Sequence, residues 1–402
     1  MATIYEWARD EDFEEIVDLA NYVFSHSNKR TDFPSLLPKL YEKAYGHACH
    51  HVLAREDGRI KALVGVFPVD VSVGGKLLRT CGIGMVAVHP YSRHSGYMKT
   101  LMAMADQAMR DSGAQFACLS GQRQRYQYSG FEKCGLRVLA QVNESNIRHR
   151  FGSGYASRIN FGALTPQSPE LPVCGDLYSR RIVHAERDPS RFFDTLRTWD
   201  SDAWIIRREN AILGYLCADR KGEGIGEFVL KAEASRFNGD QAEILAAWLA
   251  HRSIPSVKVH LSPWAQGDIA SLSTLAEQIR MDVDQNFCVY DFNRTIEAFF
   301  AVKSSYTPLP EGSLVLGIEG RGSIRISFAD GCIRSESTEE PANLVLPYLG
   351  AMEFFFGHLR VVAPGLAETL GRPGPALWTG KERELAGSWF PLPLALDEQD
   401  MV

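Results

Sequence analysis

The chain has 402 residues, of which 45% are hydrophobic and 10% aromatic, and its formal net charge is −6. This amount of apolar material can fill two or three buried cores, so we expect a globular protein of several domains. The Lys and Arg residues are scattered along the chain. Because a nucleic-acid backbone is bound by a concentrated basic surface, we expect no nucleic-acid partner.

Signals for secretion or membrane insertion are absent from the sequence. The first ten residues lack a basic region followed by an apolar run, and no later stretch offers about twenty uninterrupted apolar residues. The eight cysteines lie far apart and form no Cys-x-x-Cys pair. These features predict a cytoplasmic protein with reduced thiols, without disulfides and without a zinc site.

The chain begins with strand and helix patterns in alternation. Residues 3–7 predict a short strand, and Asp10 is expected to cap a helix whose apolar residues follow at helical spacing. A second helix is expected at residues 36–45. Strands are then predicted at 51–55 and 60–73, and glycine-containing turns make this part a four-stranded antiparallel run.

The spacing of apolar residues changes from the period of a strand to that of a helix at Arg93-His94-Ser95-Gly96. A buried strand is expected at 116–120. A nucleotide pyrophosphate needs backbone N–H groups at a helix N-terminus, a glycine for close approach and a nearby cation. This turn offers all three. An ordinary strand-to-helix turn explains so short a match equally well.

A second candidate segment is Arg125-Tyr126-Gln-Tyr128-Ser-Gly-Phe131. Acyl transfer from a thioester expels a thiolate, which a Tyr hydroxyl within hydrogen-bond reach can protonate. Tyr126 is the favoured one of the two tyrosines. The alternative is that both rings simply pack under the sheet.

The middle of the chain repeats the pattern of its beginning. The hairpin pattern at 204–218 matches that at 52–66, and an amphipathic helix and a strand follow in the same order. These features predict a duplicated fold. Residues 232–239 stand where the phosphate-binding turn would be, and nothing in them indicates a second cofactor site.

The last hundred residues have a different pattern of three hairpin strands, a helix at 344–356 and a proline-rich tail. We expect a third, α+β domain. The fold class is therefore predicted to be mixed α/β, with domains at residues 1–151, 152–295 and 296–402.

Taken in order, the motifs Val86–Gly96 and Tyr126–Phe131 resemble those of the GNAT superfamily of N-acetyltransferases. The whole chain is similar to the Eis-like (enhanced intracellular survival) acetyltransferases. Those proteins have an active GNAT domain, a degenerate second GNAT domain and a C-terminal domain like the sterol carrier proteins. Residues 320–331 and 341–349 carry the last resemblance.

The resemblance implies an acetyl-CoA-dependent enzyme that acetylates a primary amine by direct attack in a ternary complex, with an aminoglycoside, polyamine or lysine-like acceptor. It also implies a homo-oligomer, a hexamer of threefold-related dimers. The residues it assigns to acetyl-CoA are Val86, Ala87, Val88, Arg93, His94, Ser95, Gly96, Tyr97, Met98, Gly121 and Gln122.

Two catalytic roles also follow from the resemblance. Tyr126 is expected to be the general acid, and the carboxylate of Val402 is expected to accept the proton after the tail 389–402 returns to the active site. The alternative for the tail is a frayed terminus. Met98 stands where many GNAT loops have a small residue, and Val402 stands where many relatives end in an aromatic residue.

A different class of function is a binding protein whose third domain holds an apolar ligand while the first domain is catalytically silent. The aromatic run Phe354–Phe356 could line such a pocket, although its spacing favours a core. His47, His50 and His51 could bind a metal, but a loop explains them as well, and no metal is expected. Buried structural roles are expected for Cys81 and Cys118, which have no evident activating cation.

Overall fold

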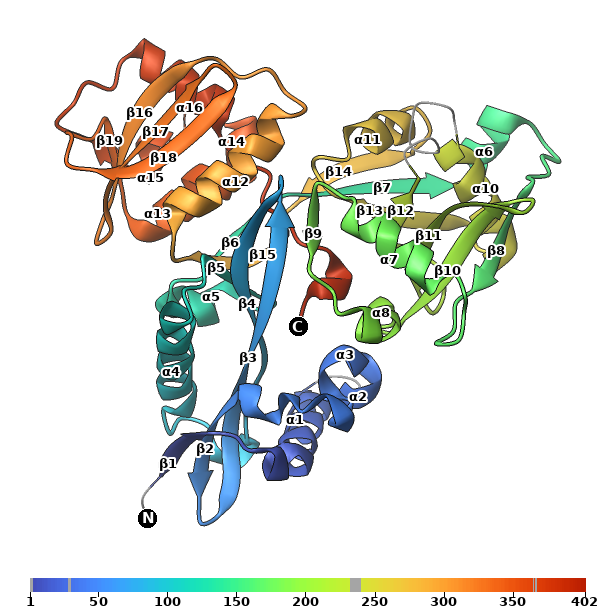
Figure 1. Ribbon diagram of the computed structural model, residues 1–402, viewed down its shortest axis with the longest axis horizontal. Coiled ribbons are helices and arrows are strands. Elements are labelled where there is room, and N and C mark those ends of the chain that lie inside the picture. The colour runs from blue at the N-terminus through green and yellow to red at the C-terminus, as the bar shows by residue number, and fades with distance from the viewer. Residues whose placement is uncertain (1–2, 28–29, 232–239, 364, 366) are drawn as a thin grey trace.

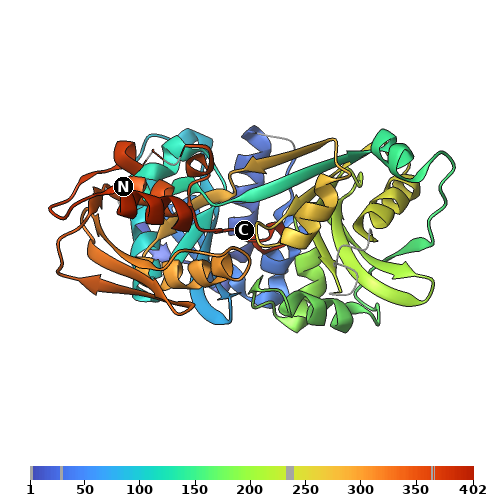
Figure 2. The ribbon, with the colours of Figure 1, turned by 90° about the horizontal axis from the view of Figure 1, so that it is seen from above.

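The computed structural model describes residues 3–27, 30–231, 240–363, 365 and 367–402. Figure 1 shows three lobes, coloured from blue at the N-terminal end through green and yellow to orange and red. The C-terminus lies in the middle, where the lobes meet, in both views (Figures 1 and 2). Within the described residues, no helix is long and apolar enough to cross a membrane.

The first lobe is built on an eight-stranded sheet. Its main order is β1 (Ile4–Trp7), β2 (His51–Glu56), β3 (Arg59–Val73), β4 (Lys76–Val88), β5 (Phe116–Leu119), β15 (Gln285–Val289) and β6 (Glu132–Cys134), while β9 (Val183–Ala185) pairs with β3. The predicted strands and hairpin turns at the N-terminal end are confirmed.

Helices cover both faces of this sheet. On one face lie α1 (Phe13–Ser27) and α2 (Phe33–Leu36), and on the other lies α4 (Tyr97–Asp111). Side chains of the central strands alternate between two cores, so that Leu63 packs on the α1 side and Val64 on the α4 side.

Two details of the predicted helices in this lobe are wrong. The helix expected at 36–45 is interrupted, because α3 (Pro38–Tyr41) begins at a proline and Leu37 has left the helical region with φ −130° and ψ 61°. A residue that precedes a proline is pushed out of the helical conformation. Asp10 opens a short 3₁₀ turn, Asp10–Asp12, and the residue in the capping position is Arg9.

The second lobe contains a seven-stranded sheet. Its order is β14 (Gln278–Asp282), β7 (Arg137–Asn143), β13 (Ser256–Leu261), β12 (Gly224–Leu230), β11 (Ala211–Asp219), β10 (Ser201–Arg208) and β8 (Ile159–Ala163). The predicted hairpin, the helix α10 (Asp240–Arg252) and the following strand are confirmed. The prediction for residues 232–239 lies outside the described residues.

The first two sheets exchange strands. The segment β7 precedes residue 151 but pairs with β13 and β14 of the second sheet. The segment β15 precedes residue 295 but pairs with β5 and β6 of the first sheet. The domain limits at 151 and 295 thus stay a prediction. Each of the first two sheets contains a strand from the residue range expected to form the other domain.

The third lobe has a five-stranded sheet in the order β18 (Cys332–Thr338), β17 (Gly322–Ala329), β16 (Gly312–Ile318), β19 (Leu344–Leu346) and β20 (Arg372–Pro373). The packed helices include α12 (Phe292–Ser304), α13 (Tyr348–Phe356) and α16 (Gly380–Trp389). The helix expected at 344–356 starts only after Pro347, because residues 344–346 form a strand beside β16. The predicted core role of Phe354–Phe356 is confirmed, since all three side chains are buried.

Candidate active site

The central feature of the first lobe is an opening in its sheet. The parallel ladder between β4 and β5 ends at the pair Ile83–Leu119, while β4 continues to Val88. On its other edge, β4 has a bulge opposite β3, where the register shifts between Leu63 and Gly65, and Met85 has a φ of 48°. A bulge bends its strand and increases the local twist. The two parallel strands therefore separate and leave a gap that both faces of the sheet can reach.

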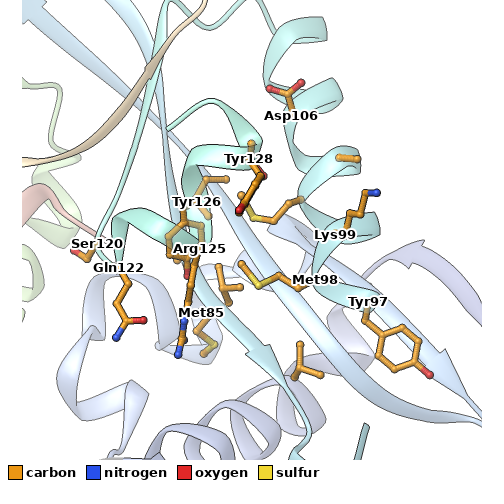
Figure 3. A pocket seen from close by; sticks show the side chains of 18 of the residues that line it. Met85, Tyr97, Met98, Lys99, Asp106, Ser120, Gln122, Arg125, Tyr126 and Tyr128 are labelled. Atoms are coloured by element: carbon orange, nitrogen blue, oxygen red, sulfur yellow. The ribbon is translucent and has the colours of Figure 1, made fainter. Parts of the chain in front are cut away.

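A cavity of about 1650 Å³ runs through this gap. Figure 3 shows side chains from β4, α4 and α5 (Arg123–Tyr126) around it. The lining includes ten of the residues expected to contact acetyl-CoA, namely Val86, Val88, Arg93, His94, Ser95, Gly96, Tyr97, Met98, Gly121 and Gln122. The remaining one, Ala87, has its side chain in the core on the α1 side.

The turn before α4 presents backbone groups to the cavity. His94 and Gly96 have φ values of 72° and 80°, and Gly96 caps the helix that starts at Tyr97. The Tyr97 side chain points away from the other labelled residues (Figure 3), and its hydroxyl donates a hydrogen bond to Glu56. What Tyr97 can offer a ligand is its backbone N–H, in the first turn of a 15-residue helix whose N-terminal end favours anions.

Tyr126 lies at the C-terminal end of α5 and lines the same cavity. It is 8% exposed, whereas Tyr128 is 88% exposed. A Cβ atom on Gly121, whose φ is 151°, would lie 2.5 Å from Cε2 of the Tyr126 ring. Burial raises the pKa of Tyr126, against a lowering by Arg125. The phenol therefore keeps its proton at neutral pH, as a proton donor must.

The C-terminal tail is packed along its length. Residues 390–395 are buried beside the third lobe, and the backbone N–H of Leu136 donates to the Leu394 carbonyl at 2.8 Å. The last residue, Val402, is 8% exposed and lines the cavity. A Cβ atom on Gly84 would lie 3.2 Å from the carboxyl carbon of Val402. The chain end thus lies beside β4, at the opening of the sheet.

Charged side chains of the second lobe hold the tail just before its end. Arg187 Nε donates to Asp400 Oδ1 at 2.7 Å, and a terminal nitrogen of the same guanidinium lies 2.5 Å from Glu227 Oε2. The Tyr178 hydroxyl donates to Asp400 at 2.6 Å. Burial alone would raise the pKa of Asp400, but the adjacent Arg187 outweighs it and holds that pKa below its usual value.

A buried lysine of the first lobe also reaches the tail. Lys39 Nζ donates to the Gln399 carbonyl, and Thr198 Oγ1 donates to the same oxygen at 3.2 Å. Burial lowers the pKa of Lys39 to about 7, although the attraction of Asp400 raises it. Contacts from two lobes therefore fix the backbone immediately before Val402.

The cysteines near the cavity are not activated nucleophiles. Cys288 lines the cavity, and burial raises its pKa. Burial raises the pKa of Cys81 to about 11 and that of Cys118 to about 12. Both thiols are protonated at neutral pH, and the thiol form is a poor nucleophile. Their predicted place in the core is confirmed.

The histidines that suggested a metal pack around Phe67. The rings of His47, His50 and His51 lie 6.5, 6.0 and 5.3 Å from its ring centre. Burial lowers the pKa of His51 to about 4. Among the described residues, no group of three or more His, Cys, Asp or Glu side chains has the geometry to hold a metal ion.

Two contributions to the site were missed from the sequence. Trp199 of the second lobe lines the cavity of the first, and no motif marks it. The anchors Arg187 and Glu227 were also missed. The only available signal was the set of acidic residues at the tail, Asp397, Glu398 and Asp400, which need cationic partners if they are buried.

Comparison with known proteins agrees with this geometry. Residues 5–136 match the family model described as the acetyltransferase (GNAT) domain. This part of the chain is therefore similar to GNAT acetyltransferase domains. No curated protein sequence matches the chain significantly.

Solved structures extend the likeness in fold to the whole chain. A GCN5-related N-acetyltransferase from Anabaena variabilis has a TM-score of 0.70 at 16% identity, with 100% of both chains covered. A second, from Kribbella flavida, has a TM-score of 0.68 at 16% identity, covering 100% of this chain and 98% of the other. Eis1 from Mycobacterium abscessus has a TM-score of 0.64 at 12% identity, with 100% of both chains covered. At these identities the likeness is one of fold, and it agrees with the predicted tandem GNAT-like folds.

Proposed function

We propose that this protein transfers the acetyl group of acetyl-CoA to a primary amine, with Tyr126 as general acid and the Val402 carboxylate as proton acceptor. The observation that carries the proposal is that one cavity is lined by a buried phenol, by the chain end and by the turn 93–96. A proton donor and a proton acceptor thus share a space that also offers backbone N–H groups for a pyrophosphate.

The residues present fit acetyl-CoA. The backbone of the turn 93–96 and the first N–H groups of α4 would hold the pyrophosphate, with Arg93 as the cation. The β4 edge from Gly84 to Val88, beyond the end of the ladder with β5, has backbone groups that can pair with the amides of the pantetheine arm. When bound, acetyl-CoA supplies an acyl group activated as a thioester.

The residues of the chain then have distinct tasks. A primary alkyl amine has a pKa near 10 and arrives as the ammonium ion, so it must lose a proton before it can attack. The Val402 carboxylate attracts the cation and accepts this proton, directly or through water. The new C–N bond forms as the C–S bond breaks, and Tyr126 donates its proton to the departing thiolate. Neither step needs an acyl-cysteine.

A thiol-release assay with purified protein, acetyl-CoA and a panel of primary amines tests the proposal. We expect amine-dependent release of CoA, and a loss of about 10²–10⁴-fold in kcat for Tyr126→Phe, which removes only the donor. Tyr128→Phe is the matched control, because Tyr128 lies at the solvent-exposed rim of the same cavity. If no amine released CoA, or if both variants behaved alike, the proposal would be wrong.

Two further expectations belong to the proposal. A third lobe of the sterol-carrier type and a hexameric assembly both come from the resemblance to the Eis-like enzymes. Sedimentation analysis of the purified chain distinguishes a hexamer from a monomer, and a monomer with full activity would separate the chemistry from assembly.

A further inference from the structure

The cavity has two chemically different halves, one on each face of the first sheet. The half on the α1 side is lined by large apolar side chains from three separate parts of the chain. They are Phe24, Phe33, Leu36, Met85 and Trp199, and they surround the position of Val402. This half lies opposite the α4 turn that would hold the pyrophosphate, so it is the place for the acceptor amine.

Within the described part of the chain, the negative charge on the acceptor side is that of the chain end. Among the described residues that line the whole cavity, the one acidic side chain is that of Asp106. Asp106 lies on α4, on the other face of the sheet (Figure 3), where it accepts hydrogen bonds from Tyr290 at 3.0 Å and from Arg110 at 2.9 Å. An acceptor can therefore have one of its ammonium groups paired inside this half of the cavity.

This distribution discriminates between classes of amine. A second or third ammonium group of a polyamine or aminoglycoside would lie against aromatic and aliphatic side chains without a counter-charge, which is unfavourable. An apolar body attached to a single ammonium group would instead gain from burial against the same side chains. The lining thus favours one charge on an apolar body.

Trp199 presents its ring, not its indole N–H, to this apolar half. Its indole nitrogen Nε1 is buried and has no hydrogen-bond partner among the described residues. Trp199 and Asp200 have φ values of 60° and 57°, a left-handed conformation that non-glycine residues rarely adopt. The neighbouring backbone fixes this conformation, because the Trp199 N–H donates to the Leu36 carbonyl at 2.8 Å.

Strained backbone is often kept where it serves a ligand. We propose that the acceptor is a monocationic primary amine on an apolar, aromatic-sized body, which packs against the ring of Trp199. This inference rests on the proposed function and names the substrate class of the same site.

Rates of acetylation compared across four amines test the inference. The probes are phenethylamine, 4-methoxyphenethylamine, spermidine and kanamycin, measured at one fixed ionic strength because charge interactions are screened by salt. We expect kcat/KM to be at least about 10-fold higher for the two aromatic amines, as expected for burying several apolar carbons.

The variant Trp199→Leu keeps an apolar side chain and removes the aromatic ring. We expect it to lower kcat/KM for the two aromatic amines by about 5-fold more than for spermidine or kanamycin, because the ring packs against the aromatic body. Trp204→Leu is the control, because Trp204 packs against Trp248 in the second lobe and does not line the cavity.

The possible outcomes separate this inference from the proposed function. Preference for spermidine or kanamycin would overturn the inference and leave acetyl transfer intact. An equal loss for the aromatic amines and for spermidine and kanamycin in Trp199→Leu would overturn the role of the Trp199 ring. Absence of transfer to all four amines and to lysine peptides would overturn the proposed function, and the inference with it.

Discussion

The first and second GNAT-like sheets both open between a pair of parallel strands. In the first, β4 and β5 stay paired to Ile83 and Leu119, and in the second, β12 and β13 stay paired to Ile225 and Val259. Beyond these pairs the first sheet has a cavity of about 1650 Å³ and the second one of about 170 Å³.

The difference between the two openings comes from the chain's own tail. The 3₁₀ turn Glu398–Asp400 packs against β12, and a Cβ atom on Gly226 would lie 3.0 Å from Glu398 Oε2. Asp397 lines the small cavity that is left. The same architectural opening is therefore left as a large cavity in one sheet and holds a segment of the protein in the other, as expected when function belongs to the site and not to the fold.

Removing Arg187, which holds the tail in the second opening, should cause the largest change, a loss of stability. Arg187→Met removes the guanidinium that bonds both Glu227 and Asp400, and leaves these buried carboxylates poorly compensated, which should lower the free energy of unfolding by about 3–5 kcal/mol. Urea denaturation measures this change. In the control Arg220→Met, an exposed pair with Asp200 is lost, and a change of at most about 1 kcal/mol is expected. Equal effects would show that the second opening does not hold the tail as described.

A paired glycine substitution compares the two openings directly. An Ala Cβ at Gly82 would lie 2.4 Å from Cγ2 of Val402, whereas at Gly226 it would meet Glu398, which lies farther from the chain end. We expect kcat to fall about 100-fold for Gly82→Ala, because displacing a reacting group by about 1 Å is that costly. The change for Gly226→Ala should be severalfold smaller.

The control for this pair is Gly175→Ala, since an added Cβ there would meet no atom within 4 Å. Steady-state kinetics at saturating acetyl-CoA provide the measurement. If Gly226→Ala lowered kcat more than Gly82→Ala, the second opening would be the more important of the two for catalysis, contrary to the account.

The buried lysine beside the tail should give stability a dependence on pH. Lys39 has a pKa of about 7 in the folded protein, below its ordinary value of 10.5, so the unfolded chain binds more protons between these values. Its contribution to the free energy of unfolding therefore increases as the pH rises from about 7 to 10.5, by at least about 1 kcal/mol. Denaturation curves of wild type and Lys39→Met should diverge over this window. A constant difference would contradict the shifted pKa.

Local features of the fold could be predicted from the sequence. The pattern change at Arg93–Gly96 placed the turn before α4, because a switch of apolar period is a local signal. The same logic gave the hairpins of the second lobe. The same reasoning failed where a proline interrupts a helical pattern. Pro38 divides the helix expected at 36–45, and Pro347 delays the start of the helix expected at 344–356.

Long-range features could not be predicted in this way. The exchange of β7 and β15 between sheets depends on pairing partners more than a hundred residues away. Trp199 reaches the cavity through a left-handed backbone conformation, and no neighbouring residue in the sequence indicates that conformation. The expected return of the tail to the active site came mainly from the resemblance, and its anchors Arg187 and Glu227 carry no motif.

The most direct test of the central claim changes one functional group at the chain end. A tail of residues 389–402 can be joined by ligation to the rest of the chain, either with a free carboxylate or with Val402 as its amide. We predict that the amide lowers kcat at least about 100-fold and leaves acetyl-CoA affinity unchanged, because only the proton acceptor is lost. Equal kcat for the two ligated proteins would contradict the account and remove Val402 from the reaction.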